Sequence, residues 1–459
     1  MRDSLGTAEG SRPNVIWIIG DQHRGQSLSC TGDPNLETPN IDRLAGVGAT
    51  GISGSPLCSP FRGSLLTSQY PHNCVPGHDH AMPDGMPTIA TALRNAGYRT
   101  AFFGKWHVDG ADNRPPGSRD VFQLVRRERR GDFGTWLGYE LNNSQWDCWV
   151  HGHDSSGTAV EHYRLPGYET DALTDLLIDY VRYQDDKAGD TERPFFAVLS
   201  VQPPHSPYLA PPEWMARHRP GDIRLRPNVP NVPRIADEAR RDLAGYYAMI
   251  ENLDWNVGRV MDALTICGLR DTTYIAFFSD HGDMHGSHGL VLKCLPYEES
   301  IRTPFIVGIG DRICCQPGFA SQTALINHVD IAPTTLGLCG IDVPDWMTGY
   351  DYSRFYMASP LDDRDGPDSA FLQLVEPGYT YGFAPDRERP WRGIVTRDGW
   401  KYAVLEGQPW MMFNLNEDPY ELANIAMDRR FAAERKRLQD RLAAWIADTG
   451  DSFELPDIG

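Results

Sequence analysis

The sequence predicts an α/β protein in which a layered sheet lies between helices and a smaller α+β unit follows. Short continuous apolar runs recur along the first two thirds of the chain, and each is typical of a strand buried on both faces. Segments with apolar residues at helical spacing separate these runs. Beyond residues 359–368, where Pro, Asp and Gly accumulate, shorter alternating segments indicate a second sheet.

Length and composition limit the class of protein. A chain of 459 residues can bury a large core, and its net charge of −19 argues against nucleic-acid binding, which needs basic patches. Nine cysteines at irregular spacing favour free thiols. No window is apolar enough to span a bilayer, and residues 1–13 lack the apolar core of a secretory signal. We therefore expect a soluble cytoplasmic protein without nucleic-acid or membrane partners.

The first elements alternate between strand and helix. Residues 14–19 predict the first strand, and residues 38–44 predict a short helix with a proline in its first turn. Residues 88–96 predict a second helix, which Gly97 ends, and residues 99–103 predict the next strand. This order favours strands that run parallel.

The second group of elements contains the longest helix. Residues 170–183 predict an amphipathic helix, and residues 194–201 predict another buried strand. Residues 237–267 predict the longest helix, and residues 273–279 and 304–309 predict two more strands. The apolar stripe of that helix consists of Leu243, Tyr247, Ile250, Leu253, Val257, Met261 and Leu264.

Two segments set the domain organisation. Residues 109–167 are rich in Gly, Pro, Trp, His and Asn with little periodicity, which predicts a substrate-facing insertion or lid. The composition shift near residues 359–368 predicts a catalytic domain over residues 1–365 and a C-terminal subdomain over residues 366–459. The predicted elements of this subdomain are strands near residues 370–375, 393–396 and 402–405 and a terminal helix at 429–447.

Several predicted strands end in polar, ionisable residues. Asp21, Lys105, His205 and Asp280 each lie just beyond such an end. In open α/β sheets, ligands bind at the carboxyl ends of strands, so these four side chains should converge on one site.

Cys58 is the candidate nucleophile. It lies between Pro56 and Pro60, with Arg62 four residues on and an apolar helical run behind it. The prolines predict a rigid turn at a helix start, where the helix N-terminus and the guanidinium favour a thiolate or a bound oxyanion. A buried Cys that packs as a small hydrophobe is the alternative.

Residues 58–62, Cys-Ser-Pro-Phe-Arg, resemble the Cys-x-Pro-x-Arg signature of the formylglycine-dependent sulfatases, and residues 97–107 resemble that family's second signature. One departure is Ser68, where most relatives have Gly. Further similar stretches lie near residues 14–44, 200–208, 279–304 and 391–424, the last of which includes a turn-to-helix segment that we interpret as structural.

This resemblance implies a fold similar to alkaline phosphatase: a large mixed, mostly parallel sheet between helices, with a small C-terminal α+β subdomain. It also implies that a formylglycine-generating enzyme oxidises Cys58 to formylglycine, whose hydrated aldehyde is the nucleophile.

A divalent metal is expected beside this residue. Asp21 and Asp280 follow apolar strands, and paired carboxylates suit a hard cation, although each could equally be a helix cap or an ion-pair partner. A His ligand also admits Mn²⁺. The resemblance implies one metal ion, with Ca²⁺ favoured over Mn²⁺ or Mg²⁺. Its implied ligands are Asp21, Gln22, Asp280, His281 and the formylglycine from Cys58, and many relatives have Asp and Asn in place of Gln22 and His281.

The resemblance assigns roles to six catalytic positions: Cys58, Arg62, Lys105, His107, His205 and Lys293. Lys105 and His107 are expected to hold the formylglycine, and His205 with Lys293 to bind sulfate and assist departure of the alcohol. The metal and the cations would neutralise the sulfate oxygens. One hydroxyl of the hydrated aldehyde would attack sulfur, and the second would let the sulfo-enzyme intermediate collapse and expel sulfate.

The predicted function is hydrolysis of a sulfate monoester, with a sulfated sugar favoured by similarity of residues 115–117 and 138–144 to bacterial carbohydrate sulfatases. A phosphonate or phosphate ester hydrolase and an aryl or choline sulfatase are the alternatives, since they could use the same site. A non-enzymatic binding protein is disfavoured because no expected catalytic position is lost. Other residues that could line the pocket or support the metal are Asp79, His80, His151, His153, His285 and His288.

Overall fold

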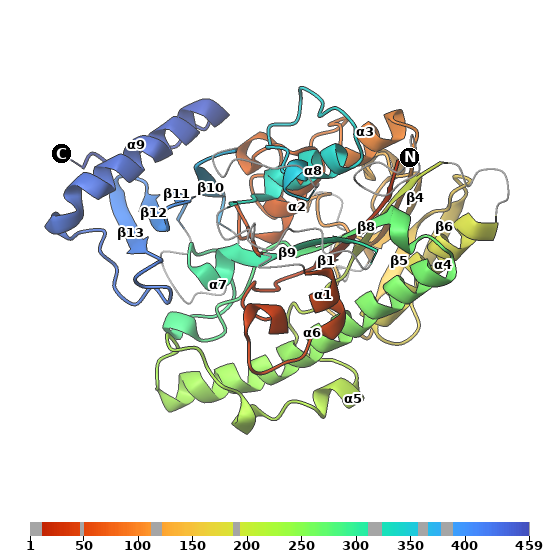
Figure 1. The fold of residues 1–459 in the computed structure, drawn as a ribbon, viewed down its shortest axis with the longest axis horizontal. Coiled ribbons are helices and arrows are strands. Elements are labelled where there is room, and N and C mark those ends of the chain that lie inside the picture. The colour runs from red at the N-terminus through yellow and green to blue at the C-terminus, as the bar shows by residue number, and fades with distance from the viewer. Residues whose placement is uncertain are drawn as a thin grey trace.

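The structure, a computed structural model, describes residues 12–45, 50–111, 122–186, 193–310, 324–356, 366–377 and 389–458. Its centre is a nine-stranded sheet in the order β2-β9-β8-β1-β7-β3-β4-β5-β6, with helices on both faces (Figure 1). From β8 to β4 the neighbouring strands pair in parallel, and the outer pairs are antiparallel. The predicted mixed, mostly parallel sheet between helices is therefore confirmed.

The strands of this sheet are β1 (Asn14–Gly20), β2 (Thr50–Ile52), β3 (Arg99–Lys105), β4 (Thr135–Tyr139), β5 (Trp149–His153), β6 (Ala159–Arg164), β7 (Phe195–Ser200), β8 (Thr273–Ser279) and β9 (Arg302–Ile309). The α-helices of the described residues are α1 (Pro39–Leu44), α2 (Cys58–Thr67), α3 (Ile89–Asn95), α4 (Glu169–Asp186), α5 (Pro212–Met215), α6 (Pro233–Ile266), α7 (Glu298–Ile301), α8 (Ile331–Leu338) and α9 (Ala432–Thr449).

Strand β1 shows why the apolar runs fold as central strands. Successive side chains of a strand point to opposite faces, so Trp17 packs on the face covered by α2, α3 and α8, whereas Ile16 and Ile18 pack on the face covered by α1, α4 and α6. All seven residues of β1 are buried. A run that is apolar on both faces can be satisfied only between two helical layers.

Residues 135–164, within the segment expected to be an irregular insertion, add three strands to the edge of the sheet. Trp136 of β4 stacks on Phe102 of β3 and meets Trp106 edge to face. The irregular register between β5 and β6 explains why no clear alternation marks these strands in the sequence. That the segment faces the substrate stays a prediction.

The C-terminal residues form a separate four-stranded antiparallel sheet, as the alternating segments predict. One side of it packs against α9, and the other packs against the catalytic part of the chain. Figure 1 shows this sheet, in blue, between α9 and α7. Its strands are β10 (Ser369–Leu374), β11 (Trp391–Thr396), β12 (Trp400–Leu405) and β13 (Gln408–Asn414). The domain boundary at residue 365 lies outside the described residues and stays a prediction.

A test of the central sheet uses Gly104, which precedes Lys105 in β3. Its φ of 109° lies in the left-handed region, and a Cβ there would collide with the carbonyl oxygen of Ser200 in β7. We expect Gly104→Ala to lower the free energy of unfolding by about 2–4 kcal/mol in urea titrations. Gly221→Ala is the matched control, because nothing lies within 4 Å of its Cβ position. Equal stability of the two variants would contradict the packing argument.

A second test concerns Glu140, which follows β4. One carboxylate oxygen accepts a hydrogen bond from the Asp109 backbone N–H at 2.8 Å, and burial raises the pKa of Glu140 from 4.5 to about 8. The folded protein therefore holds a proton that the unfolded chain releases, so stability should fall as pH rises through this window. Urea titrations of wild type and Glu140→Gln at pH 5 and about pH 8 should show a smaller fall for the variant; an equal fall would contradict the assignment.

Candidate active site

Cys58 begins α2, which is buried along its whole length. Pro60 lies in the first turn, where its missing N–H costs no helical hydrogen bond. Ser68 ends the helix with a φ of 52°, a conformation that favours glycine, and its hydroxyl donates to the Val329 carbonyl at 2.7 Å. The serine side chain thus makes a contact that a glycine at this position would lack.

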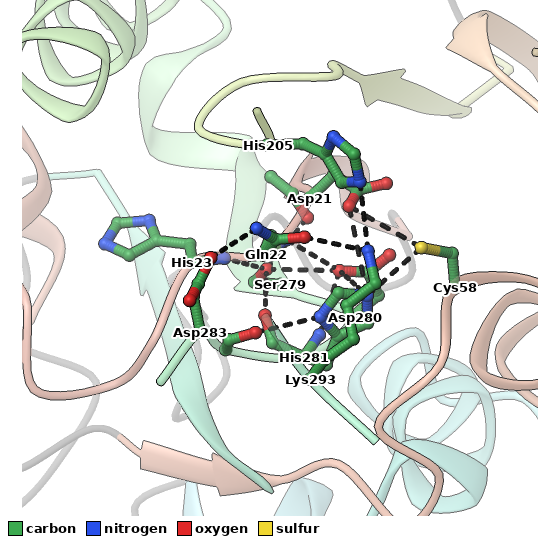
Figure 2. Close-up of polar contacts among 12 residues, drawn as sticks. Asp21, Gln22, His23, Cys58, His205, Ser279, Asp280, His281, Asp283 and Lys293 are labelled. Carbon is green, nitrogen blue, oxygen red and sulfur yellow. Dashed lines mark hydrogen bonds and ion pairs between the residues drawn. The ribbon is translucent and has the colours of Figure 1, made fainter. Parts of the chain in front are cut away.

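Four side chains, including that of Cys58, meet where β1 and β8 end and α2 begins. Asp21 follows β1, and Asp280 and His281 follow β8. Ligand atoms of these three residues and of Cys58 all lie within 4.8 Å of one another, and all four residues are buried. Figure 2 shows the group beside Lys293, whereas His23 points away from Cys58.

The charges in this group are closely balanced. Arg62, one turn into α2, donates through Nη2 to Asp21 at 3.1 Å and to Asp280 at 3.4 Å. Lys105 Nζ lies 2.6 Å from Asp21. Burial and the charge of Asp21 raise the pKa of Asp280 to about 6. A cation between the two carboxylates would let both stay ionised.

The donor set fits a divalent metal. It offers two buried carboxylates, the imidazole of His281 and the Cys58 position, where His281 Nε2 lies 3.1 Å from Sγ. Carboxylate oxygens suit Ca²⁺, Mg²⁺ or Mn²⁺, and the imidazole favours Mn²⁺ more than Ca²⁺. The charge of Asp21 raises the pKa of Asp280, so an ion between the two carboxylates would relieve their repulsion.

Gln22 lies beside these ligands and connects them to Lys293. Its φ of 68° turns the chain after β1, and its backbone N–H donates to Asp280 at 2.9 Å. Its side-chain oxygen accepts from Lys293 Nζ at 2.8 Å, while its amide nitrogen donates to Asp283 at 2.5 Å. The predicted role of Gln22 as a metal ligand stays a prediction.

His205 and Lys293 form a pair, with Nζ of Lys293 2.9 Å from Nε2 of His205. Burial and the charge of Lys293 lower the pKa of His205 to about 3. Burial alone would lower the pKa of Lys293, but nearby negative charges, Cys58 first, raise it to about 12. Lys293 is therefore protonated and His205 is neutral, and the ammonium group lies within hydrogen-bond distance of the imidazole.

The Cys58 thiol lies in a positive environment. Burial alone would raise its pKa, but the charges of Lys293, His281 and Lys105 hold the pKa of Cys58 well below its ordinary value. A ring nitrogen of His107 lies within 4.8 Å of Cys58 Sγ, and burial lowers the pKa of His107 to about 3. The six predicted catalytic residues are thus all brought to one place.

The sequence did not predict His78 or Asp283 as residues of the site. His78 and His107 pack with ring centroids 5.0 Å apart, and each offers a nitrogen within 4.8 Å of Cys58 Sγ. Asp283 accepts hydrogen bonds from Gln22 and from Tyr208. His78 belongs to an irregular stretch without any pattern, whereas Asp283 could have been found in the loop that follows β8.

The other candidate histidines lie in different surroundings. His151 contacts the backbone of Val125, and His153 contacts that of Phe133, both at the β4–β5 edge. The remaining candidates have these partners: His80 pairs with Glu376, His285 with Asp283, and His288 stacks on Tyr297. Asp79 is exposed. Within the described part of the chain, no helix has the length and apolar character needed to cross a membrane.

Comparison with known proteins agrees with this geometry. The profile of the family described as "Sulfatase" matches residues 13–341, and that described as "N-sulphoglucosamine sulphohydrolase, C-terminal" matches residues 286–448. The ulvan-active sulfatase of Formosa agariphila is 32% identical and covers 98% of this chain and 84% of the relative. The choline-sulfatase of Rhizobium meliloti is 29% identical over 96% of this chain and 88% of the relative.

Among solved structures, the YidJ protein of Bacteroides fragilis superposes with a TM-score of 0.84 at 25% identity, over 98% of this chain and 99% of the other. The alkaline-phosphatase-like fold is therefore confirmed. Profile, relatives and fold agree over nearly the whole chain, and together they show that this chain belongs to the sulfatase family and is a sulfuric ester hydrolase.

Proposed function

We propose that this sulfatase hydrolyses a sulfate ester on a sulfated sugar, with a formylglycine made from Cys58 and one divalent metal ion, Ca²⁺ in preference to Mn²⁺ or Mg²⁺. The observation that carries the proposal is that Cys58 lies close to two kinds of groups. These are the candidate metal ligands Asp21, Asp280 and His281 and the positively charged Lys105 and Lys293.

The chain's own residues supply most of the charge that a sulfate ester needs. Lys105 and Lys293 lie close enough to Cys58 to shift its pKa, so they can neutralise oxygens of a sulfate placed there. Arg62 is held between Asp21 and Asp280, so it keeps the carboxylates in position. The bound metal would supply further positive charge for sulfate oxygens and for the nucleophile.

A hydrated formylglycine would supply a hydroxyl nucleophile with a second hydroxyl on the same carbon. His107 lies within reach of Cys58, so its imidazole can hold the formylglycine in place. Lys293 Nζ lies 2.9 Å from His205 Nε2, and we assign it the proton that passes to the departing alcohol.

The substrate class rests on similarity to relatives. The relative from Formosa agariphila is named for activity on ulvan, and the one from Rhizobium meliloti for choline sulfate. The higher identity to the first favours a sulfated glycan, with an aryl or choline sulfate and a phosphonate as competing substrates. Residues 138–144, whose similarity suggested a sugar, lie beside the loop that carries His205, since the Gln202 amide donates to Asn143 at 3.2 Å. Residues 115–117 lie outside the described residues.

A sulfate-release assay tests the chemistry. The protein would be co-expressed with a formylglycine-generating enzyme, supplied with Ca²⁺, and offered sulfated glycans, aryl sulfates, choline sulfate and an aryl phosphonate. Inorganic sulfate would be measured by ion chromatography. We expect release from a sulfated glycan, and a loss of at least about 1,000-fold in Cys58→Ala because the nucleophile is removed. Cys30→Ala, which changes an exposed cysteine, should keep full activity.

Two outcomes would contradict the proposal. Undiminished sulfate release by Cys58→Ala would exclude Cys58 as the nucleophile. A large excess of catalytic efficiency on the phosphonate would move the assignment to a phosphonate hydrolase.

Metal content tests the donor set. We expect the purified protein to hold one divalent ion, a chelator to abolish activity, and added Ca²⁺ to restore it. Mutation of a residue that supports a metal ligand typically lowers metal affinity by about 10- to 100-fold, so loss of a direct ligand in Asp280→Asn should lower it by at least that much. Asp254→Asn, a buried aspartate that caps α1, is the matched control. Elemental analysis of all three proteins gives the result, and full metal content in Asp280→Asn would exclude this site.

A further inference from the structure

The small C-terminal sheet reaches the loop that carries Lys293. Trp391, the first residue of β11, donates its indole N–H to the carbonyl oxygen of Cys294 at 2.9 Å. Neither Trp391 nor Cys294 is exposed to solvent. A buried indole and a buried carbonyl each need a partner, so this hydrogen bond fixes where the chain lies directly after Lys293.

The loop needs such support because its backbone is strained. Leu292 and Cys294, on either side of Lys293, have φ values of 65° and 79°, in the region that favours glycine. Leu292 N–H donates to Asp283 at 3.0 Å, and Cys294 N–H donates to the Pro56 carbonyl at 3.2 Å. These contacts tie the strained turn to the loop after β8 and to the turn that presents Cys58.

A second tie lies four residues further on. Lys401 of β12 lies 2.7 Å from a carboxylate oxygen of Glu298 and 2.6 Å from Glu421, and all three residues are buried. The other oxygen of Glu421 accepts from the Glu298 N–H at 2.8 Å. The segment between Cys294 and Glu298 is therefore held at both ends by the C-terminal residues.

Apolar packing joins the same parts. Leu57, which precedes the candidate nucleophile, and Cys294 share one buried cluster with Leu372, Leu374 and Trp391. The sheet thus packs against the turns that carry Cys58 and Lys293.

We propose that Trp391 is a positioning residue that holds Lys293 in place to protonate the departing alcohol, an inference that rests on the proposed function. Without the indole N–H, the Cys294 carbonyl loses this 2.9 Å hydrogen bond from β11, and the strained turn relaxes. Lys293 Nζ then leaves its positions 2.8 Å from Gln22 and 2.9 Å from His205.

The test is the leaving-group dependence of Trp391→Phe on a series of aryl sulfates of rising phenol pKa. A phenol of low pKa departs without a proton, whereas one of high pKa needs the acid. We expect kcat to fall by less than about 3-fold for the most acidic phenol and by about 10-fold or more for the least acidic. A general loss of folded enzyme would lower both rates equally.

Trp445→Phe is the matched control, because the Trp445 indole donates to Ser369 at 2.9 Å in the same subdomain, away from Lys293. It should lose stability without any new leaving-group dependence. In a Lys293→Ala background, Trp391→Phe should have no further leaving-group effect, because the two changes act through one group. Glu421→Gln, a milder change at the second tie, should shift the dependence in the same direction and serves if Trp391→Phe folds poorly.

A crystal structure of Trp391→Phe tests the position of Lys293 without depending on any measured activity. Displacement of Lys293 Nζ from Gln22 and His205 supports it, even if the wild type releases no sulfate and the proposed function fails. Unchanged Lys293 contacts, or an equal fall in kcat along the whole phenol series, would overturn it.

Discussion

The pairing of Arg62 with Asp21 and Asp280 is the interaction on which the site depends. It joins the first turn of α2 to the ends of β1 and β8, so it places Cys58 against the candidate metal ligands. Two carboxylates fully removed from water would repel each other, and one guanidinium and one lysine offset that repulsion. Everything else at the site, from Gln22 to Lys293, is arranged around this charge-balanced centre.

The fold explains how residues so far apart in sequence reach this centre. Five neighbouring strands run parallel, so their carboxyl ends lie along one edge. Lys105 is the last residue of β3, and the loops after β1, β7 and β8 carry Asp21, His205 and Asp280. Lys293 arrives differently, on a strained turn held by the C-terminal sheet. The second sheet is for this reason part of the site's architecture.

Sequence reasoning predicted most of the central sheet because an apolar run such as residues 14–19 has few other ways to be buried. It placed Asp21, Lys105, His205 and Asp280 from strand ends alone, and the resemblance supplied Gln22, His107, His281 and Lys293. It missed β4, β5 and β6, which lie in a segment of little periodicity, and β5 pairs with β6 in an irregular register. It also missed His78 and the bond from Trp391 to Cys294, because contacts across such distances in sequence carry no local pattern.

The burial of α2 has a consequence for biosynthesis. Cys58 is 1% exposed in the folded chain, so an enzyme that modifies it must act before the sheet closes over the helix. Closure requires β8 to pair with β1, and the roughly 220 residues between Cys58 and the end of β8 take on the order of tens of seconds to synthesise. The proposed maturation of Cys58 would therefore compete with folding, and a chain that folds first would keep its cysteine.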